Sequence, residues 1–160
     1  MARVIRSHKF CEELLILKSA ADTGGEMLVM EGAYAPNQKW ENGVEHLHPN
    51  QEERFKVLEG MISVRISGEE KTYVAGERFQ IPPPVAHLMR NLSSAPVRLY
   101  WETRPALKAE EFFETIFGLA DAEKLYHPLQ FAVVVMAFRD VFQITQVPSW
   151  LQPVLFGPLA

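Results

Sequence analysis

The chain has 160 residues, of which 48% are hydrophobic and 22% charged, and its formal net charge is −4. This length supports one domain with a core of its own, and the composition and charge exclude disordered chains and argue against a nucleic-acid scaffold. A single cysteine excludes an internal disulfide. The first eight residues lack the apolar core of a signal peptide, and the longest apolar run, at 131–138, is too short to span a bilayer. We therefore expect a cytoplasmic protein without a transmembrane segment.

Residues 4–103 show short apolar runs separated by turn residues. Apolar runs at 13–17 and 27–30 stand on either side of a Gly-Gly turn. Residues 62–66 alternate Ile or Val with Ser or Arg, which indicates a strand with one buried face, and 98–101 predict a late strand. Strands at this density without an intervening helical pattern favour an antiparallel sandwich or barrel.

After residue 105 the pattern becomes helical. The segment 109–119 carries an apolar stripe made of Phe112, Phe113, Ile116 and Phe117. We expect this stripe to pack on the sheet, with a lid over the site or a dimer contact as alternatives.

A second helix is predicted from Pro128 to about Ile144, because proline suits a first helical turn, although a Val-Val-Val run weakens the pattern. The chain thus divides into a strand-rich part, 1–104, and a helical extension, 105–160. The extension ends in an apolar tail at 150–160 that would dock on a partner subunit or a membrane surface, and the residues leave both open.

Three of the five histidines fall in two stretches that combine metal-ligand residues with turn residues. On a strand, His46 and His48 would point to one face, and a Pro-Asn-Gln turn would bring Glu53 back to the same point. His87 follows a proline-rich turn and would join them only if the sheet closes on itself. Two imidazoles and one carboxylate on rigid strands are a ligand set for a first-row transition metal.

These stretches resemble the two conserved motifs of the cupin superfamily. The first motif (Gly, five residues, His-x-His, three or four residues, Glu, six residues, Gly) matches from His46 to Gly60, with Trp40 in place of the leading Gly. The second motif (Gly, five residues, Pro-x-Gly, two residues, His, three residues, Asn) has Pro84 in place of its central Gly. It matches at Gly76, Pro82, His87 and Asn91.

The resemblance implies a mainly β protein, an antiparallel jelly-roll β-barrel followed here by the α-helical extension. It also implies a divalent transition metal held by His46, His48, Glu53 and His87. Glu52 competes with Glu53, since the family spacing allows either. We prefer Glu53, which shares a strand face with the candidate pocket-lining residues Phe55 and Val57. Met89, on the face of His87, is a third candidate for the pocket wall.

Four ligands leave two positions open on a six-coordinate metal, which suits Fe, Mn, Ni or Co, whereas tetrahedral Zn would be nearly saturated. The residues leave open which of these five metals is bound. We expect a metal-dependent enzyme acting on a small aromatic or enolisable molecule, dioxygenase-like or isomerase- or lyase-like, with Glu53 as the catalytic residue. The alternative is a non-catalytic small-molecule-binding or sensor cupin, and the residues leave open whether the site is catalytic at all.

Two further expectations follow from charge and from strand edges. A sugar-phosphate isomerase would need Lys or Arg in the pocket, and the strand alternation points Lys56 and Arg90 away from it. Exposed sheet edges and the apolar C-terminal region favour association, so we expect a homodimer.

Overall fold

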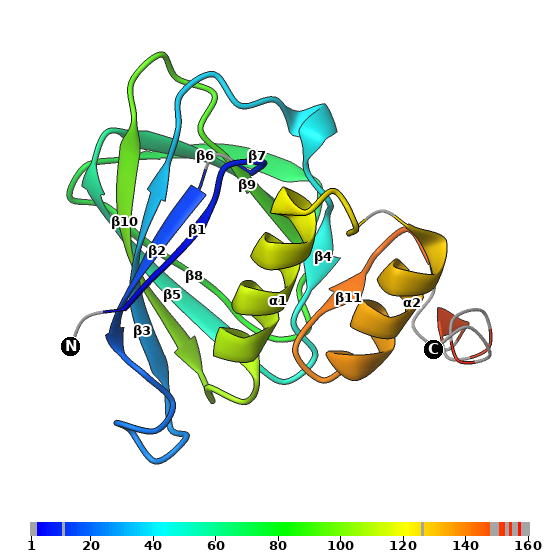
Figure 1. Ribbon diagram of the computed structural model, residues 1–160. Coiled ribbons are helices and arrows are strands. Elements are labelled where there is room, and N and C mark those ends of the chain that lie inside the picture. The colour runs from blue at the N-terminus through cyan, green and yellow to red at the C-terminus, as the bar shows by residue number, and fades with distance from the viewer. Residues whose placement is uncertain are drawn as a thin grey trace.

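The computed structural model describes residues 3–10, 12–125, 127–147, 151, 152, 154 and 157. Much of the apolar tail at 150–160 therefore lies outside the described residues. The helices are α1 (Ala109–Asp121) and α2 (Pro128–Ala137), with a short 3-10 turn at Trp40–Asn42. The strands are β1 (Arg3–Ser7), β2 (Glu12–Lys18), β3 (Leu28–Tyr34), β4 (His46–Leu47), β5 (Glu52–Glu59), β6 (Met61–Ile66), β7 (Glu69–Val74), β8 (Arg78–Ile81), β9 (His87–Arg90), β10 (Val97–Arg104) and β11 (Gln143–Ile144) (Figure 1).

The strands form two antiparallel sheets that enclose one apolar core. The first sheet has the order β1-β2-β3-β10-β5-β8, and the second has the order β11-β4-β9-β6-β7. In the described chain no ladder joins β8 or β7 to the opposite sheet, so the jelly roll is an open pair of sheets and not the closed barrel that we expected. The edge strand β7 carries exposed charged residues, as edges that avoid further pairing do.

Alternation along β5 and β10 explains how the interior is filled. On β5 the side chains of Glu53, Phe55 and Val57 are buried, because a strand turns every second side chain to the same face. Phe55 lies opposite Trp101 of β10, and Glu53 lies opposite Thr103. The β5–β6 turn depends on Gly60, whose φ of +76° and whose approach to Pro96 leave no room for a Cβ atom. Alternation therefore places the Glu53 carboxyl inside the molecule.

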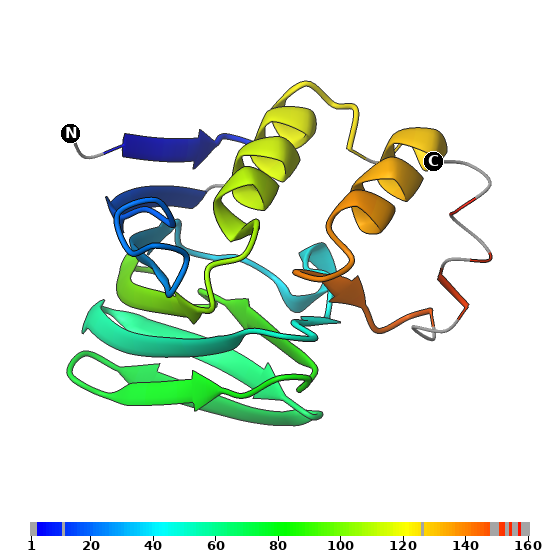
Figure 2. The ribbon, with the colours of Figure 1, turned by 90° about the horizontal axis from the view of Figure 1, so that it is seen from below.

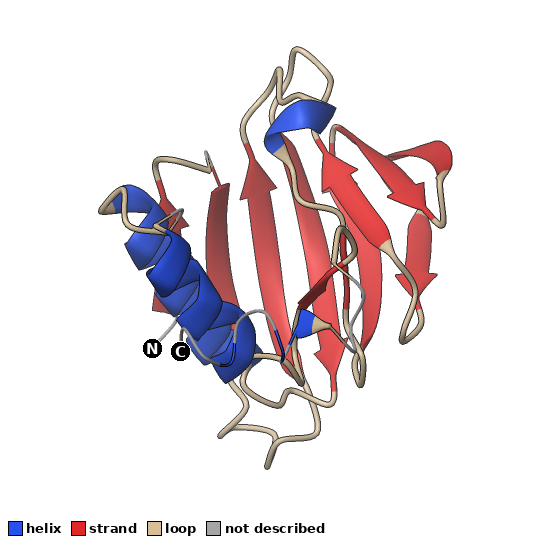
Figure 3. Ribbon diagram, turned by 90° about the vertical axis from the view of Figure 1, so that its right-hand side faces the viewer, coloured by secondary structure: helices blue, strands red, loops and turns tan. Residues whose placement is uncertain are grey.

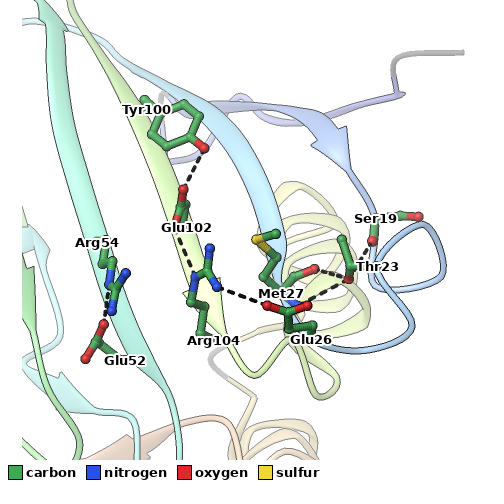
Figure 4. A network of polar contacts seen from close by, with 9 residues as sticks. All are labelled: Ser19, Thr23, Glu26, Met27, Glu52, Arg54, Tyr100, Glu102 and Arg104. Carbon is green, nitrogen blue, oxygen red and sulfur yellow. Dashed lines mark hydrogen bonds and ion pairs between the residues drawn. The ribbon is translucent and has the colours of Figure 1, made fainter.

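Polar side chains cover the outer face of the six-stranded sheet. Glu102 accepts hydrogen bonds from Tyr100 Oη at 2.7 Å and from Arg104 Nε at 3.1 Å. Arg104 Nη1 also contacts Glu26 Oε1 at 3.3 Å, and Glu52 pairs with Arg54 further along the face (Figure 4). This solvated network confirms the alternation of inward and outward positions on β5 and β10.

The two helices lie side by side on one side of the sheets (Figures 1, 2 and 3). Phe112 and Phe117 of α1 are buried and belong to the same core cluster as the strand residues. The second helix ends at Ala137 and not near Ile144, and the following chain returns as β11 to pair with β4. The β-branched run at 133–135 is nevertheless helical, and the ladder with β4 supplies backbone partners for Gln143 and Ile144. In the part of the chain that is described, neither helix is long and apolar enough to cross a bilayer.

Candidate metal centre

Three histidine rings meet where β4 and β9 run side by side. His46 and His87 are direct partners across these two strands, and their ring centroids lie 4.4 Å apart. His48 follows β4 in the chain. The centroid of its ring lies 5.1 Å from that of His46 and 5.2 Å from that of His87. One nitrogen of each ring lies within 4.8 Å of the others. Because β4 and β9 are neighbours in one sheet, the histidines converge without the closure that we expected to be necessary.

The hydrogen bonds of the three rings fix their tautomers. His46 Nδ1 lies 2.9 Å from the carbonyl oxygen of Val44, and His87 Nδ1 lies 3.0 Å from that of Val85. His48 Nδ1 contacts the carbonyl oxygen of Val141. A carbonyl oxygen only accepts, so each Nδ1 carries the proton and each neutral ring keeps a lone pair on Nε2. Backbone partners of this kind orient the imidazoles of metal sites.

Glu53 faces the histidines from the opposite sheet. Its Oε1 lies 3.3 Å from His48 Nε2, and its Oε2 lies 3.1 Å from His87 Nε2. Trp101 Nε1 donates a hydrogen bond to Oε1 at 3.1 Å. Glu52, the alternative ligand, instead pairs with Arg54 on the outer face.

The donor set of this cluster fits a metal cation. With Nε2 unprotonated, the imidazoles and the carboxylate turn lone pairs toward one another, an arrangement that only a proton or a cation relieves. Among the described residues, neither His48 Nε2 nor Glu53 Oε2 has a hydrogen-bond partner, and both residues are buried. Three imidazole nitrogens and one carboxylate oxygen are ligands that first-row divalent metals accept.

The electrostatics of the cluster keep its groups in metal-binding form. Burial, together with the neighbouring His87 and His48, holds the pKa of His46 well below its usual value, and burial also lowers the pKa of His48. Burial would raise the pKa of Glu53, but the adjacent His48 and His87 lower it to about 2. Burial lowers the pKa of His87, but its contact with the Glu53 carboxylate outweighs burial and raises it. Near neutral pH, Glu53 is therefore ionised while His46 and His48 are neutral.

A cavity of about 170 Å³ opens beside the cluster. Met89 lines it, whereas the other two candidates for its wall lie outside it: Phe55 is packed between the rings of Phe79 and Trp101, at 4.7 and 5.2 Å, and Val57 is buried deeper along β5. Trp101 lines the cavity instead, with its indole N–H on Glu53 and its ring against that of Phe55. The helices supply most of the apolar wall, through Phe112, Phe113, Ile116, Phe117, Phe131, Val134 and Val135. The connection between them adds Leu125, and the loop before β11 adds Phe142.

Sequence reasoning missed several residues of this site. Phe142 stacks on the ring of His46 with 4.9 Å between centroids, and Trp101 holds Glu53, yet neither belongs to the two motifs. Arg90 was expected to face away, but it lines the cavity together with Glu12. The predicted late strand at 98–101, which ends in Trp101, was the available sequence signal for this residue.

The comparisons with known proteins agree with this architecture. A family model described as a cupin domain matches residues 27–102, which include all four residues of the cluster. A comparison with curated protein sequences gives no match.

Three solved structures illustrate the similarity in fold. The cupin domain of an XRE-family transcriptional regulator from Enterobacter cloacae is 20% identical, with a TM-score of 0.50 over 59% of this chain and 96% of that one. A sugar phosphate isomerase from Silicibacter pomeroyi is 21% identical, with a TM-score of 0.51 over 65% and 68%. A predicted oxalate decarboxylase from Thermotoga maritima is 16% identical, with a TM-score of 0.53 over 59% and 80%. The family-model match and the two motifs identify residues 27–102 as a cupin domain, and the solved structures show the same fold.

Proposed function

We propose that this protein is a metal-dependent enzyme that acts on a small, largely apolar molecule bound in the cavity. His46, His48, Glu53 and His87 would hold a divalent transition metal, Fe, Mn, Ni or Co in preference to Zn. The observation that carries this proposal is the convergence of four lone-pair donors on the wall of a mainly apolar cavity. Two of these atoms have no hydrogen-bond partner among the described residues. A bound metal would supply Lewis acidity to a substrate oxygen, as isomerase-like or lyase-like chemistry needs, or a binding position for dioxygen, as dioxygenase-like chemistry needs.

The surrounding residues would bind and orient the substrate. The aromatic side chains of α1 and the segment after α2 exclude water and contact an apolar or aromatic body. Trp101 holds Glu53 Oε1 by its indole N–H, which leaves Oε2 as the oxygen with no hydrogen-bond donor in the described chain. Oε2 would therefore be the atom that takes up a proton from an enolisable substrate.

The variant Glu53→Gln tests both the metal site and the role of Glu53. Replacement of the carboxylate by an amide keeps an oxygen near the histidines but removes the charge and the proton acceptor. We expect the variant to retain much of the metal seen in wild-type protein by elemental analysis, and to lose turnover by about a hundredfold or more. Full activity at full occupancy would remove Glu53 from the mechanism, and a parallel loss of metal and activity would leave it as a ligand only.

Access to the metal can be tested before a substrate is known. Wild-type protein loaded with Fe(II) under anaerobic conditions is exposed to nitric oxide, and formation of an iron–nitrosyl complex is followed by electron paramagnetic resonance. A signal supports an open coordination position, and no signal from fully loaded protein would contradict the enzymatic proposal.

The second candidate function is a non-catalytic binding or sensor protein. The described residues that line the cavity include no Ser, Thr, Cys or Lys, so nucleophilic groups are scarce. A small molecule that copurifies and binds tightly without turnover would favour this candidate, whereas steady-state turnover of any substrate would exclude it.

We also propose that the protein forms a homodimer. The last residue of the outer strand β7, Val74, forms an exposed apolar pair with Met61 of β6. An exposed apolar pair at the rim of a sheet favours contact with a second copy, although the charged part of β7 does not. Light scattering at micromolar concentration should give twice the monomer mass, and a monomer mass would contradict this proposal.

A further inference from the structure

The cavity has a second polar region, formed by one residue from each sheet. Glu12 stands at the start of β2, Arg90 at the end of β9, and both line the cavity. Their side chains are 16% and 15% exposed, and Arg90 Nη1 lies 3.6 Å from Glu12 Oε1. The histidine cluster and this pair are therefore two groups of charged or ionisable side chains in a mainly apolar wall, to which Tyr34 and Asn42 also contribute.

The short strand β4 explains why Arg90 reaches the cavity. β4 pairs with β9 only through His46 and His87, so within the described chain the edge of β9 beyond His87 lacks a strand neighbour. The guanidinium of Arg90 occupies this space and packs against the backbone of Gly43, where a Cβ atom would lie 2.2 Å from Nη2. The close fit at Gly43 holds the guanidinium at the cavity wall.

The pair is incompletely satisfied. The 3.6 Å between Arg90 Nη1 and Glu12 Oε1 exceeds hydrogen-bonding distance, and Nη1 donates instead to the carbonyl oxygen of Met89 at 3.2 Å. Arg90 Nε is buried and has no acceptor in the part of the chain that is described. A purely structural ion pair in a buried place would close this gap, because an unused charged donor is costly there. The guanidinium and the carboxylate thus offer a donor and an acceptor to a third group.

We propose that Arg90 and Glu12 bind an uncharged hydroxyl group at the far end of an apolar ligand whose near end reaches the histidine cluster. This inference rests on the proposed function, and it names the class of substrate. A hydroxyl oxygen accepts a hydrogen bond from the guanidinium while its proton is donated to the carboxylate, so both partners are satisfied without a new charge. A carboxylate or an ammonium group would bring a further charge into a mainly apolar cavity, whereas a hydroxyl group brings none.

The distance along β9 sets the length of the ligand. His87 and Arg90 are three residues apart, which corresponds to about 10 Å along a strand. An extended chain of about eight heavy atoms spans this distance. The aromatic side chains of α1 lie along the wall of the same cavity and would contact the apolar middle of such a ligand.

Hydroxamates test this inference, because the hydroxamate group binds the metal and the tail can be varied. Dissociation constants are measured by titration calorimetry on Co(II)-loaded protein for three probes: octanohydroxamic acid, its 8-hydroxy derivative and suberic acid monohydroxamate, which ends in a carboxylate. For the wild type we expect the 8-hydroxy probe to bind about tenfold or more tightly than the unsubstituted probe, as expected for hydrogen bonds to charged groups. R90M should abolish this preference, and E12Q, whose amide oxygen still accepts a hydrogen bond but carries no charge, should reduce it. Both variants should leave the binding of octanohydroxamic acid within about threefold.

K56M is the matched control, because Lys56 belongs to the outer face of β5 and is not among the cavity residues. It should keep the wild-type preference. Equal binding of the plain and 8-hydroxy probes to the wild type, or a preference that survives both R90M and E12Q, would overturn this inference. Tightest binding of the carboxylate probe would overturn the choice of a hydroxyl. Failure of all three probes to bind would instead contradict the metal site itself.

Discussion

Strand β5 passes through two regions of the interior that differ in almost every property. At Val57 the surroundings are the apolar side chains of both sheets, with Ile62, Val64 and Leu99 fully buried. At Glu53, four residues along the same face, the surroundings are three imidazoles, an indole N–H and a cavity. Alternation alone turns both side chains inward, so the strand supplies the same geometry to two different chemical environments.

The region around Val57 stabilises the fold, whereas the region around Glu53 supplies the groups for metal binding that we propose. The Val57 region gains free energy by removing apolar surface from water, at about 25 cal/mol per Å². The Glu53 region gathers buried polar groups whose desolvation opposes folding unless a cation or a proton compensates it. We therefore expect substitutions in the two regions to change different measurements, stability in one and metal binding in the other.

The largest effect is expected for His48→Ala. Loss of one of four ligands should lower metal affinity by at least about a thousandfold, since removal of an outer hydrogen-bond partner alone costs about 10- to 100-fold in metal sites. Elemental analysis after dialysis should fall from about one metal per chain to near zero. Circular dichroism controls for folding, and unchanged metal content would contradict the assignment of the ligands.

Ile62→Ala tests the opposite region. Ile62 is fully buried in the core, and truncation of such a side chain leaves a cavity that costs about 2–5 kcal/mol in the free energy of unfolding. Urea unfolding of the metal-free protein should show this loss, while metal content at saturating metal stays at the wild-type value. A loss of metal equal to that of His48→Ala would show that the two regions are not independent.

The sequence was sufficient for the two motifs and for most of the strands, because period-two alternation and ligand spacing are local properties. It was insufficient where distant segments meet. Phe142 reaches His46 because β11 pairs with β4, and no local pattern predicted that the segment after α2 would form a strand. Arg90 departs from its predicted face because β4 ends early, which depends on chain length between elements and not on the residues of β9.

Glu12→Gln tests how a buried carboxyl group in the cavity changes the free energy of unfolding with pH. Burial raises the pKa of Glu12 to about 7 from 4.5, although Arg90 and the side chain of Gln38 oppose the shift. The pKa of Glu12 is higher in the folded chain than in the unfolded chain. The contribution of Glu12 to the free energy of unfolding is therefore greatest below about pH 4.5 and is lost as the pH rises through about 7. Arg90 and the phenol of Tyr34 are the charged and titratable groups that face Glu12.

The free energy of unfolding of the wild type, relative to that of Glu12→Gln, should therefore fall by about 3 kcal/mol at most between these two pH values. Groups common to both proteins, the histidines included, cancel in this difference. Urea unfolding at pH 4.5 and pH 7.5 measures it with metal-free samples. A relative stability that rises with pH would mean that the pair with Arg90 outweighs burial.

The smallest effect is expected one residue from the proposed ligand, in Glu52→Gln. Glu52 pairs with Arg54 on the outer face of β5, where Arg54 is 52% exposed, and exposed ion pairs contribute about 0–1 kcal/mol. The variant removes one carboxylate charge, as Glu53→Gln does, so it controls for net charge and for proximity in sequence. We expect wild-type metal content and a change of less than about 1 kcal/mol in the free energy of unfolding. If Glu52→Gln lost the metal while Glu53→Gln kept both metal and activity, the inward and outward faces of β5 would be exchanged, because a shift of one residue moves every side chain to the opposite face.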